Sequence, residues 1–142
     1  MSRREDITVD IYRTLLNADD PRFGLVSREP FDAQQLSRQQ FPAVYITTAD
    51  EDRNDISMTP TGLRESTMNV VLTAWVNGKN VDTLRNDVIE RVEEALEADR
   101  TRGGIARWTQ LRSVVVDFDV VEPFGSVEIT IEVYYTYQRG QA

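Results

Sequence analysis

The sequence predicts a single α+β domain, in which one mostly antiparallel sheet carries two helices on one face in the order α-β-β-α-β-β. Three observations predict this fold class. Apolar residues recur at helical spacing behind the N-terminus and over residues 81–99. Four segments rich in β-branched residues read as strands, at residues 43–48, 63–76, 111–121 and 126–137. The length of 142 residues suits one domain (1–142) with its own core.

The first helix is marked by a capping signal. Ser2 followed by Glu5 is typical of a capping box, in which each side chain accepts a hydrogen bond from the other residue's backbone amide. Behind this signal, four apolar residues fall on one helical face: Ile7, Ile11, Leu15 and Leu16. The helix is expected to end near the Asp-Asp-Pro of residues 19–21 and to cover the sheet.

Two long loops are expected. Residues 21–40 contain Gly24, Pro30 and scattered apolar residues that either fold back on the core or await a partner. Residues 50–62 are acidic at the start and end in a Pro-Thr-Gly turn. We expect residues 50–62 to be a mobile excursion that can be removed without loss of the fold but not without damage to assembly. The residues of this loop expected to face a partner are Asp50, Glu51, Asp52, Arg53 and Asp55.

The central strand and the second helix have the clearest patterns. In strand 63–76 alternate residues are apolar, which predicts a sheet that is covered on one side; these are Met68, Val70, Leu72, Ala74 and Val76. Asn80 is expected to cap helix 81–99, and Gly103 and Gly104 follow its end. The apolar stripe of this helix consists of Leu84, Val88, Val92, Ala95 and Leu96.

The last two strands are expected to form a hairpin around residues 122–125. The twelve residues 126–137 would span about 40 Å as a strand, longer than usual. We therefore expect this strand to extend beyond its own core and to offer its tyrosines to a neighbouring subunit. The expected interface consists of Tyr134, Tyr135 and Tyr137, with Arg112 or Arg139 pairing with a neighbour's Glu128 or Glu132.

The residue types present exclude several kinds of catalysis. The chain has no histidine and no cysteine, so His-based triads, thiolate nucleophiles and disulfides are excluded. It contains neither a P-loop nor a G-x-G-x-x-G motif. We predict that the protein is not an enzyme and has no cofactor. Two other classes stay open: a ligand-binding α+β module, and a carboxylate enzyme that would need a metal.

One acidic segment partly matches a calcium motif. Asp50, Asp52 and Asn54 match the first three ligand positions of an EF-hand loop. The position that needs glycine is Asp55, however, and the position of the bidentate glutamate is Thr61. An EF-hand is therefore excluded, and either a weak surface cation site or a solvated loop remains.

The charge balance disfavours a nucleic-acid binder. Twenty-four acidic and sixteen basic residues give a net charge of −8, and no basic run is longer than Arg3-Arg4. The N-terminus lacks the apolar segment of a signal peptide, and no apolar run reaches the roughly 18 residues of a membrane helix. We expect a soluble protein that folds in the cytoplasm and contacts no membrane.

Several segments together point to a known family. They are Phe-Pro-Ala-Val-Tyr-Ile at residues 41–46, a strand ending in Trp75-Val76, a helix from Val81-Asp82, and Ile-Glu-Val-Tyr-Tyr-Thr-Tyr at residues 131–137. Their order resembles that of the tail-terminator (tail-completion) proteins of siphophages and related phage-like particles, over nearly the whole chain. Related head-closure and tube subunits share this pattern and stay open as alternatives.

The resemblance implies a structural virion protein with no catalytic residues. Members of this family form hexameric rings that cap the tail tube, end its polymerisation and join it to the head connector. The implied partners are further copies of the chain, the tail-tube protein and the head–tail connector, with assembly in the host cytoplasm. DNA would be passing cargo and not a ligand, and carboxylates facing the lumen of a ring would repel it.

Overall fold

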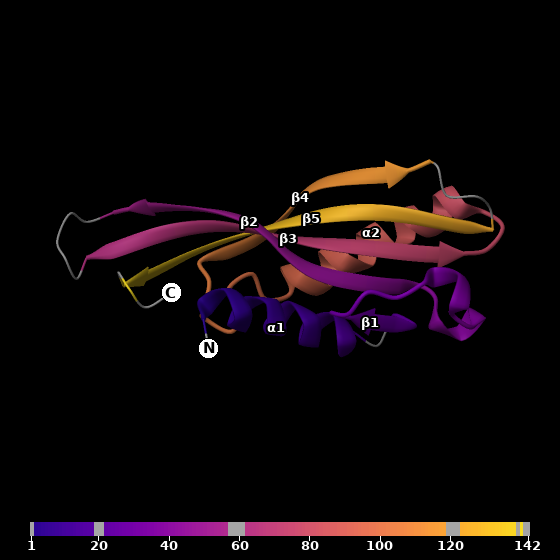
Figure 1. Ribbon diagram of the computed structural model, residues 1–142, viewed down its shortest axis with the longest axis horizontal. Helices are drawn as coiled ribbons and strands as arrows, with labels where there is room; N and C mark the ends of the chain where they lie inside the picture. Colours follow the sequence, from indigo (N-terminus) through magenta and orange to yellow (C-terminus); the bar gives the residue numbers. More distant parts are fainter. Residues whose placement is uncertain (1, 19–21, 57–61, 119–122, 139, 141–142) are drawn as a thin grey trace.

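The computed structural model describes residues 2–18, 22–56, 62–118, 123–138 and 140. In chain order the described residues form α1 (Arg3–Leu16), β1 (Leu25–Ser27), η1 (Ala33–Gln35), η2 (Arg38–Gln40), β2 (Ala43–Asp55), β3 (Leu63–Asn77), α2 (Val81–Glu97), β4 (Trp108–Asp117) and β5 (Phe124–Gln138). The strands form one sheet in the order β1-β2-β3-β5-β4, in which only the β1–β2 pairing is parallel. The predicted fold class is confirmed (Figure 1).

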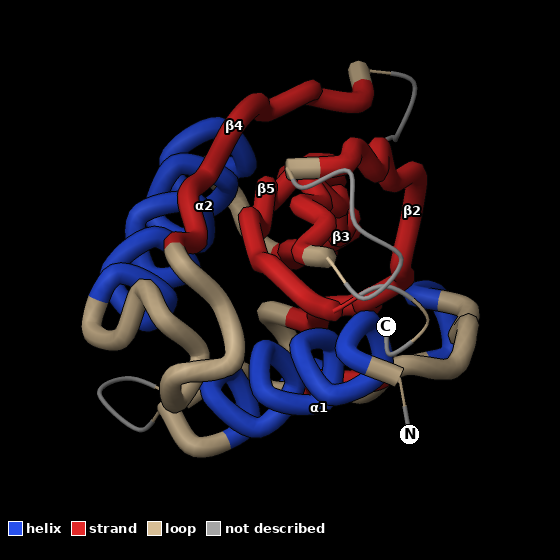
Figure 2. The backbone as a smooth tube through the Cα atoms, turned by 90° about the vertical axis from the view of Figure 1, so that its left-hand side faces the viewer, coloured by secondary structure: helices blue, strands red, loops and turns tan. Residues whose placement is uncertain are grey.

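Both helices pack on the same face of the sheet, which we call the inner face. The apolar residues predicted for strand 63–76 all lie on this face and are buried, as are Ile129 and Ile131 of β5. Ile7, Ile11 and Leu15 of α1 and Val88, Val92 and Leu96 of α2 join them in one core. Figure 2 looks along the long axis and shows α1 below the strands and α2 beside them.

The helix ends differ from the prediction in detail. The Ser2 hydroxyl accepts a hydrogen bond from the Glu5 amide at 3.1 Å, as expected of a cap. The Glu5 carboxylate pairs with Arg28, just beyond β1, so it links α1 to the segment that follows it. Asn80 is the N-cap residue of α2, as predicted, but its side chain makes no capping hydrogen bond. Leu16 is exposed instead of contributing to the apolar face.

The segment 21–40 is more ordered than a loop. Leu25–Ser27 pairs in parallel with the first three residues of β2, and two short 3₁₀ helices follow. Phe23 and Val26 are buried in the core. The apolar residues of this segment therefore fold back on the domain.

The acidic segment 50–55 was expected as a loop, and the structure corrects this. β2 continues to Asp55 and remains paired with β3. Thr48 pairs with Val70 and Glu51 with Met68, so the bulge between them contains one extra residue of β2. That residue reverses the alternation of side chains, and Glu51 therefore faces the inner side. Residues 57–61, the rest of the expected loop, lie outside the described residues.

Three strands continue beyond the helices as an extension that we call the arm, made of residues 50–55, 63–68 and 133–138. Figure 1 shows the arm on the side of the molecule away from α2. The last strand is unusually long, as predicted, and β5 has 15 residues where twelve were expected. β4 pairs with β5 only from Tyr134 back to Ser126, so it does not continue along the arm beyond Tyr134.

Candidate functional site

A buried carboxylate joins the arm to α1. The side chain of Glu51 is only 5 % exposed. Its Oε1 accepts a hydrogen bond from Arg4 Nη1 at 2.8 Å, and its Oε2 accepts one from the Tyr135 hydroxyl at 3.0 Å and pairs with Arg53. Arg4 Nη2 also donates to the carbonyl of Ala49 at 3.0 Å. We call Glu51, Arg4, Arg53 and Tyr135 the Glu51 cluster.

The Glu51 cluster keeps its carboxylate ionised. Burial raises the pKa of Glu51, but hydrogen bonds outweigh that effect and hold the pKa below its ordinary value of 4.5. The donors are Arg53, Arg4 and Tyr135. Burial raises the pKa of the Tyr135 hydroxyl. Near neutral pH the Glu51 carboxylate is therefore ionised and paired with arginines, and the Tyr135 phenol is neutral. These contacts hold the arm against α1.

Replacing Glu51 by glutamine should lower the free energy of unfolding by about 2 kcal/mol at pH 7, because hydrogen bonds to a buried charge are lost. The folded-state pKa of Glu51 is lowered, so its stabilisation is complete above the ordinary value of 4.5 and is lost as the pH falls through the folded-state pKa. The difference between wild type and variant should therefore shrink in acid. Urea unfolding at neutral and acidic pH measures the difference in unfolding free energy between wild type and variant.

Glu93→Gln on the exposed face of α2 is the matched control for this experiment. It should change the stability little at either pH, because an exposed side chain is screened by water. A difference between wild type and Glu51→Gln that stays constant from neutral to acidic pH would contradict an ionised Glu51 in the fold.

The structure places two of the predicted interface tyrosines inside the chain. Tyr135 and Tyr137 are 0 % and 4 % exposed, and they lie on the inner face of the arm. Their rings contact each other with centroids 5.8 Å apart, and the Arg53 guanidinium lies 5.2 Å from the centroid of the Tyr137 ring. The expectation that these side chains are surplus exposed surface is corrected, because the residues of the arm cover one another.

The other predicted interface residues lie on the outer face, which no helix covers in the described part of the chain. Tyr134 stacks on Trp108 at 5.6 Å and donates to Glu65 at 2.6 Å. Arg112 lies 3.5 Å from Glu132 of its own chain. Glu128 is exposed on the same face. Arg139 lies outside the described residues.

Apolar side chains are exposed at the far end of β4. Val115 is 59 % exposed and Phe118 is 84 % exposed. With Trp75 of β3 they line a shallow depression of about 520 Å³ on the outer face. At the tip of the arm, Ile56 and Leu63 are also exposed. Exposed apolar groups at strand edges are typical of surfaces that contact other proteins.

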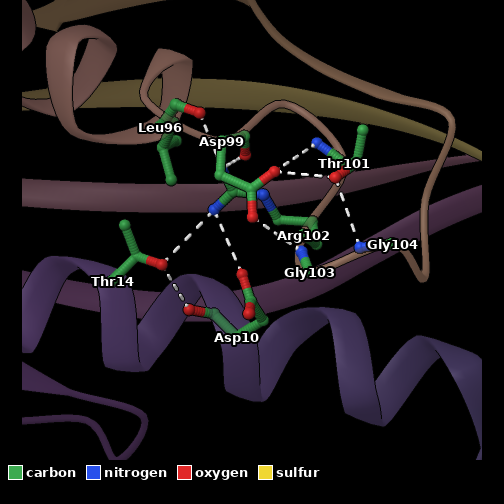
Figure 3. A network of polar contacts seen from close by, with 8 residues as sticks. All are labelled: Asp10, Thr14, Leu96, Asp99, Thr101, Arg102, Gly103 and Gly104. Carbon is green, nitrogen blue, oxygen red and sulfur yellow. Dashed lines mark hydrogen bonds and ion pairs between the residues drawn. The ribbon is translucent and has the colours of Figure 1, made fainter.

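A second polar cluster joins the two helices (Figure 3). Arg102 has a positive φ of 51° and a fully buried side chain. Its Nη2 donates to the carbonyls of Leu96, at 2.6 Å, and Asp99, and its Nη1 lies 3.3 Å from Asp10 of α1. The carboxylate of Asp99 accepts from the Thr101 amide and hydroxyl and from the Gly103 amide. Arg102 thus satisfies carbonyls at the end of α2 and ties them to α1.

Sequence reasoning missed Arg4 and Arg102, although each has a local signal. Arg4 lies in the first turn of α1, where the helix dipole disfavours a cation, so it indicates an acidic partner elsewhere in the chain. Arg102 directly precedes Gly103-Gly104 beyond the end of α2, where a basic side chain can reach the last carbonyls.

Two kinds of site, a metal-binding cluster and a membrane-spanning helix, are absent from the described residues. These residues contain no group of three or more His, Cys, Asp or Glu placed to hold a metal ion. Within the same residues, no helix has the length and apolar character needed to span a membrane.

Comparisons with known proteins show what the fold resembles. No family model matches the chain, and no curated protein sequence matches it. A chain in the solved structure titled "Virion of native gene transfer agent (GTA) particle" is similar over 92% of this chain and 94% of that chain. The TM-score is 0.51 at 9% sequence identity. The two chains therefore share a fold over nearly their whole lengths.

Proposed function

We propose that the protein is a structural component of a phage-like virion and that it serves there as the tail terminator. In this role a ring of copies, six as in the family it resembles, caps the tail tube, ends its polymerisation and joins it to the head connector. The observation that carries the proposal is the fold shared with a chain of a gene transfer agent virion over 92% of this chain. The order of strands and helices, which resembles that of tail terminators, supports the finer role.

Two features of the structure support a role in assembly. The arm extends past the helices and offers an exposed tip. The outer face of the sheet carries exposed apolar groups, and no helix of the described residues covers them. The exposed side of α2 is strongly acidic, which suits a conduit that lets DNA pass without binding it. Its acidic residues are Asp82, Asp87, Glu90, Glu93, Glu94 and Glu97.

Deleting the encoding gene from a strain that produces the particles should give overlong tails that lack heads, because nothing would stop the tube or join it to the connector. Negative-stain electron microscopy of the particles measures tail length and head attachment. A copy of the gene supplied in trans should restore normal tails.

Other outcomes separate the alternatives. Particles without any tail would identify a tube subunit, and free tails of normal length beside heads that have lost DNA would identify a head-closure protein. Normal infective particles would contradict a structural role in the virion.

A further inference from the structure

Both lateral edges of the sheet are free over most of their length. β4 is the last strand on one side, and on the other side β1 covers only Ala43–Tyr45 of β2. Among the described residues, no strand lies beside the outer edge of β4 or beside residues 50–55 of β2. The two free edges lie in opposite halves of the elongated molecule (Figure 1). Free edges present backbone N–H and C=O groups that can pair with another strand.

The two edges differ in charge, although the exposed Asp117 ends β4. The β2 edge in the arm carries Asp50 and Asp52, both exposed. Arg107 precedes β4, and Arg112 lies within it with a side chain 56 % exposed. Apolar groups accompany both edges, with Val115 on β4 and Ile56 beyond the end of β2.

Asp52 and Arg112 also share a face of the sheet. Glu51 and Arg53 face the inner side, so Asp52 between them faces the outer side. Arg112 occupies a bulge in β4 and reaches Glu132, which is on the outer face of β5. β2 and β4 run in opposite directions in the sheet, so the outer faces of two copies coincide when β4 of one meets β2 of the other in antiparallel pairing. In that arrangement the two charges project from the same side, as cross-strand ion pairs do.

We propose that the free β4 edge of one copy of this chain pairs with the β2 edge in the arm of a second copy, with Asp52 beside Arg112. Backbone hydrogen bonds would hold the strands, and the charges would select the partner edge. Two β2 edges would bring aspartates together, and two β4 edges would bring arginines together, so pairing of like edges is disfavoured. The inference goes beyond the proposed function, because it rests on the sheet alone and holds for any number of copies.

Charge exchange tests the contact. Asp52→Arg and Arg112→Asp should each weaken self-association by about tenfold or more, because each places like charges together. An equimolar mixture of the two variants, or the double variant, should restore association. Sedimentation velocity over a concentration series measures the self-association. The controls are Glu93→Arg and Arg13→Asp, which make the same charge changes on exposed parts of the helices. Unchanged association of both single variants, or failure of the mixture and the double variant, would overturn the inference.

Cross-linking provides a second measurement, and the absence of native cysteine makes it specific. Chains carrying Asp52→Cys and chains carrying Arg112→Cys should form disulfide-linked pairs when mixed and oxidised, and few when each is oxidised alone. Equal linkage in all three samples, or no linkage in the mixture, would overturn the edge pairing.

The deletion strain separates this inference from the proposed function. The Asp52→Arg variant supplied in trans should fail to restore normal tails. Glu29→Arg makes a like charge change at an exposed position outside the two pairing edges and outside the acidic side of α2, and it should restore them. If Asp52→Arg restores them fully, the edge pairing is overturned and the virion role stands. If the deletion itself has no effect on tails, the virion role fails while the association measurements still decide the pairing.

Discussion

Replacing Tyr135 by alanine should lower the free energy of unfolding of the isolated chain by about 3–5 kcal/mol, the usual effect of deleting a buried aromatic ring. Tyr135 is fully buried, its ring contacts Tyr137, and its hydroxyl donates to Glu51. The variant would leave a cavity in the arm and remove a donor from a buried carboxylate. Urea unfolding followed by circular dichroism measures the change.

Two further variants separate the ring from its hydroxyl. Tyr135→Phe keeps the ring and should lower the unfolding free energy by about 1–3 kcal/mol, since only the hydrogen bond to Glu51 is lost. Tyr134→Ala removes the neighbouring ring on the outer face and should have a smaller effect than Tyr135→Ala, since that ring is only partly buried. If Tyr135→Ala unfolded like wild type but associated less, Tyr135 would be an interface residue, as the sequence suggested.

Replacing Arg102 by alanine should lower the free energy of unfolding by about 3 kcal/mol. The guanidinium donates hydrogen bonds to two carbonyls at the end of α2 and faces Asp10 of α1. Its removal leaves these acceptors without a donor. Alanine would also keep the positive φ of this position, 51°, without the contacts that hold it. Thermal and urea unfolding of the purified variant measure the loss.

Glycine and a nearby arginine serve as controls for Arg102. Arg102→Gly should lose about 1 kcal/mol less than Arg102→Ala, because glycine adopts a positive φ without steric cost. Arg100→Ala removes an exposed guanidinium 3.4 Å from Glu97 and should cost less than about 1 kcal/mol. Similar losses for Arg102→Ala and Arg100→Ala would show that Arg102 does not join the helices.

Local sequence patterns were sufficient to predict both long helices and the two long strands β3 and β5. Apolar residues at helical spacing predicted α1 and α2, and alternation predicted β3, β5 and the buried face that they share. β1 was missed because three residues, Leu25–Ser27, are too short to show a period, and this strand exists only through its pairing with β2.

The segment 50–55 was misread because its composition is that of a solvated loop. Its strand conformation depends on pairing with β3, and the orientation of Glu51 depends on a bulge that no local pattern reveals. The same limit applies to Tyr135. Alternation correctly placed it on the face of Ile129 and Ile131, but whether that face is covered in the arm depends on other strands.

Side-chain periodicity within each segment was sufficient to predict the fold class, the order of the main elements and most residues of the core. Which polar residues are buried and paired, by contrast, depends on the tertiary structure. Arg4 and Glu51 are separated by 47 residues, and Arg102 and Thr14 by 88. Such contacts form only when the sheet brings distant segments together, so a residue that looks solvated in the sequence can become part of the interior.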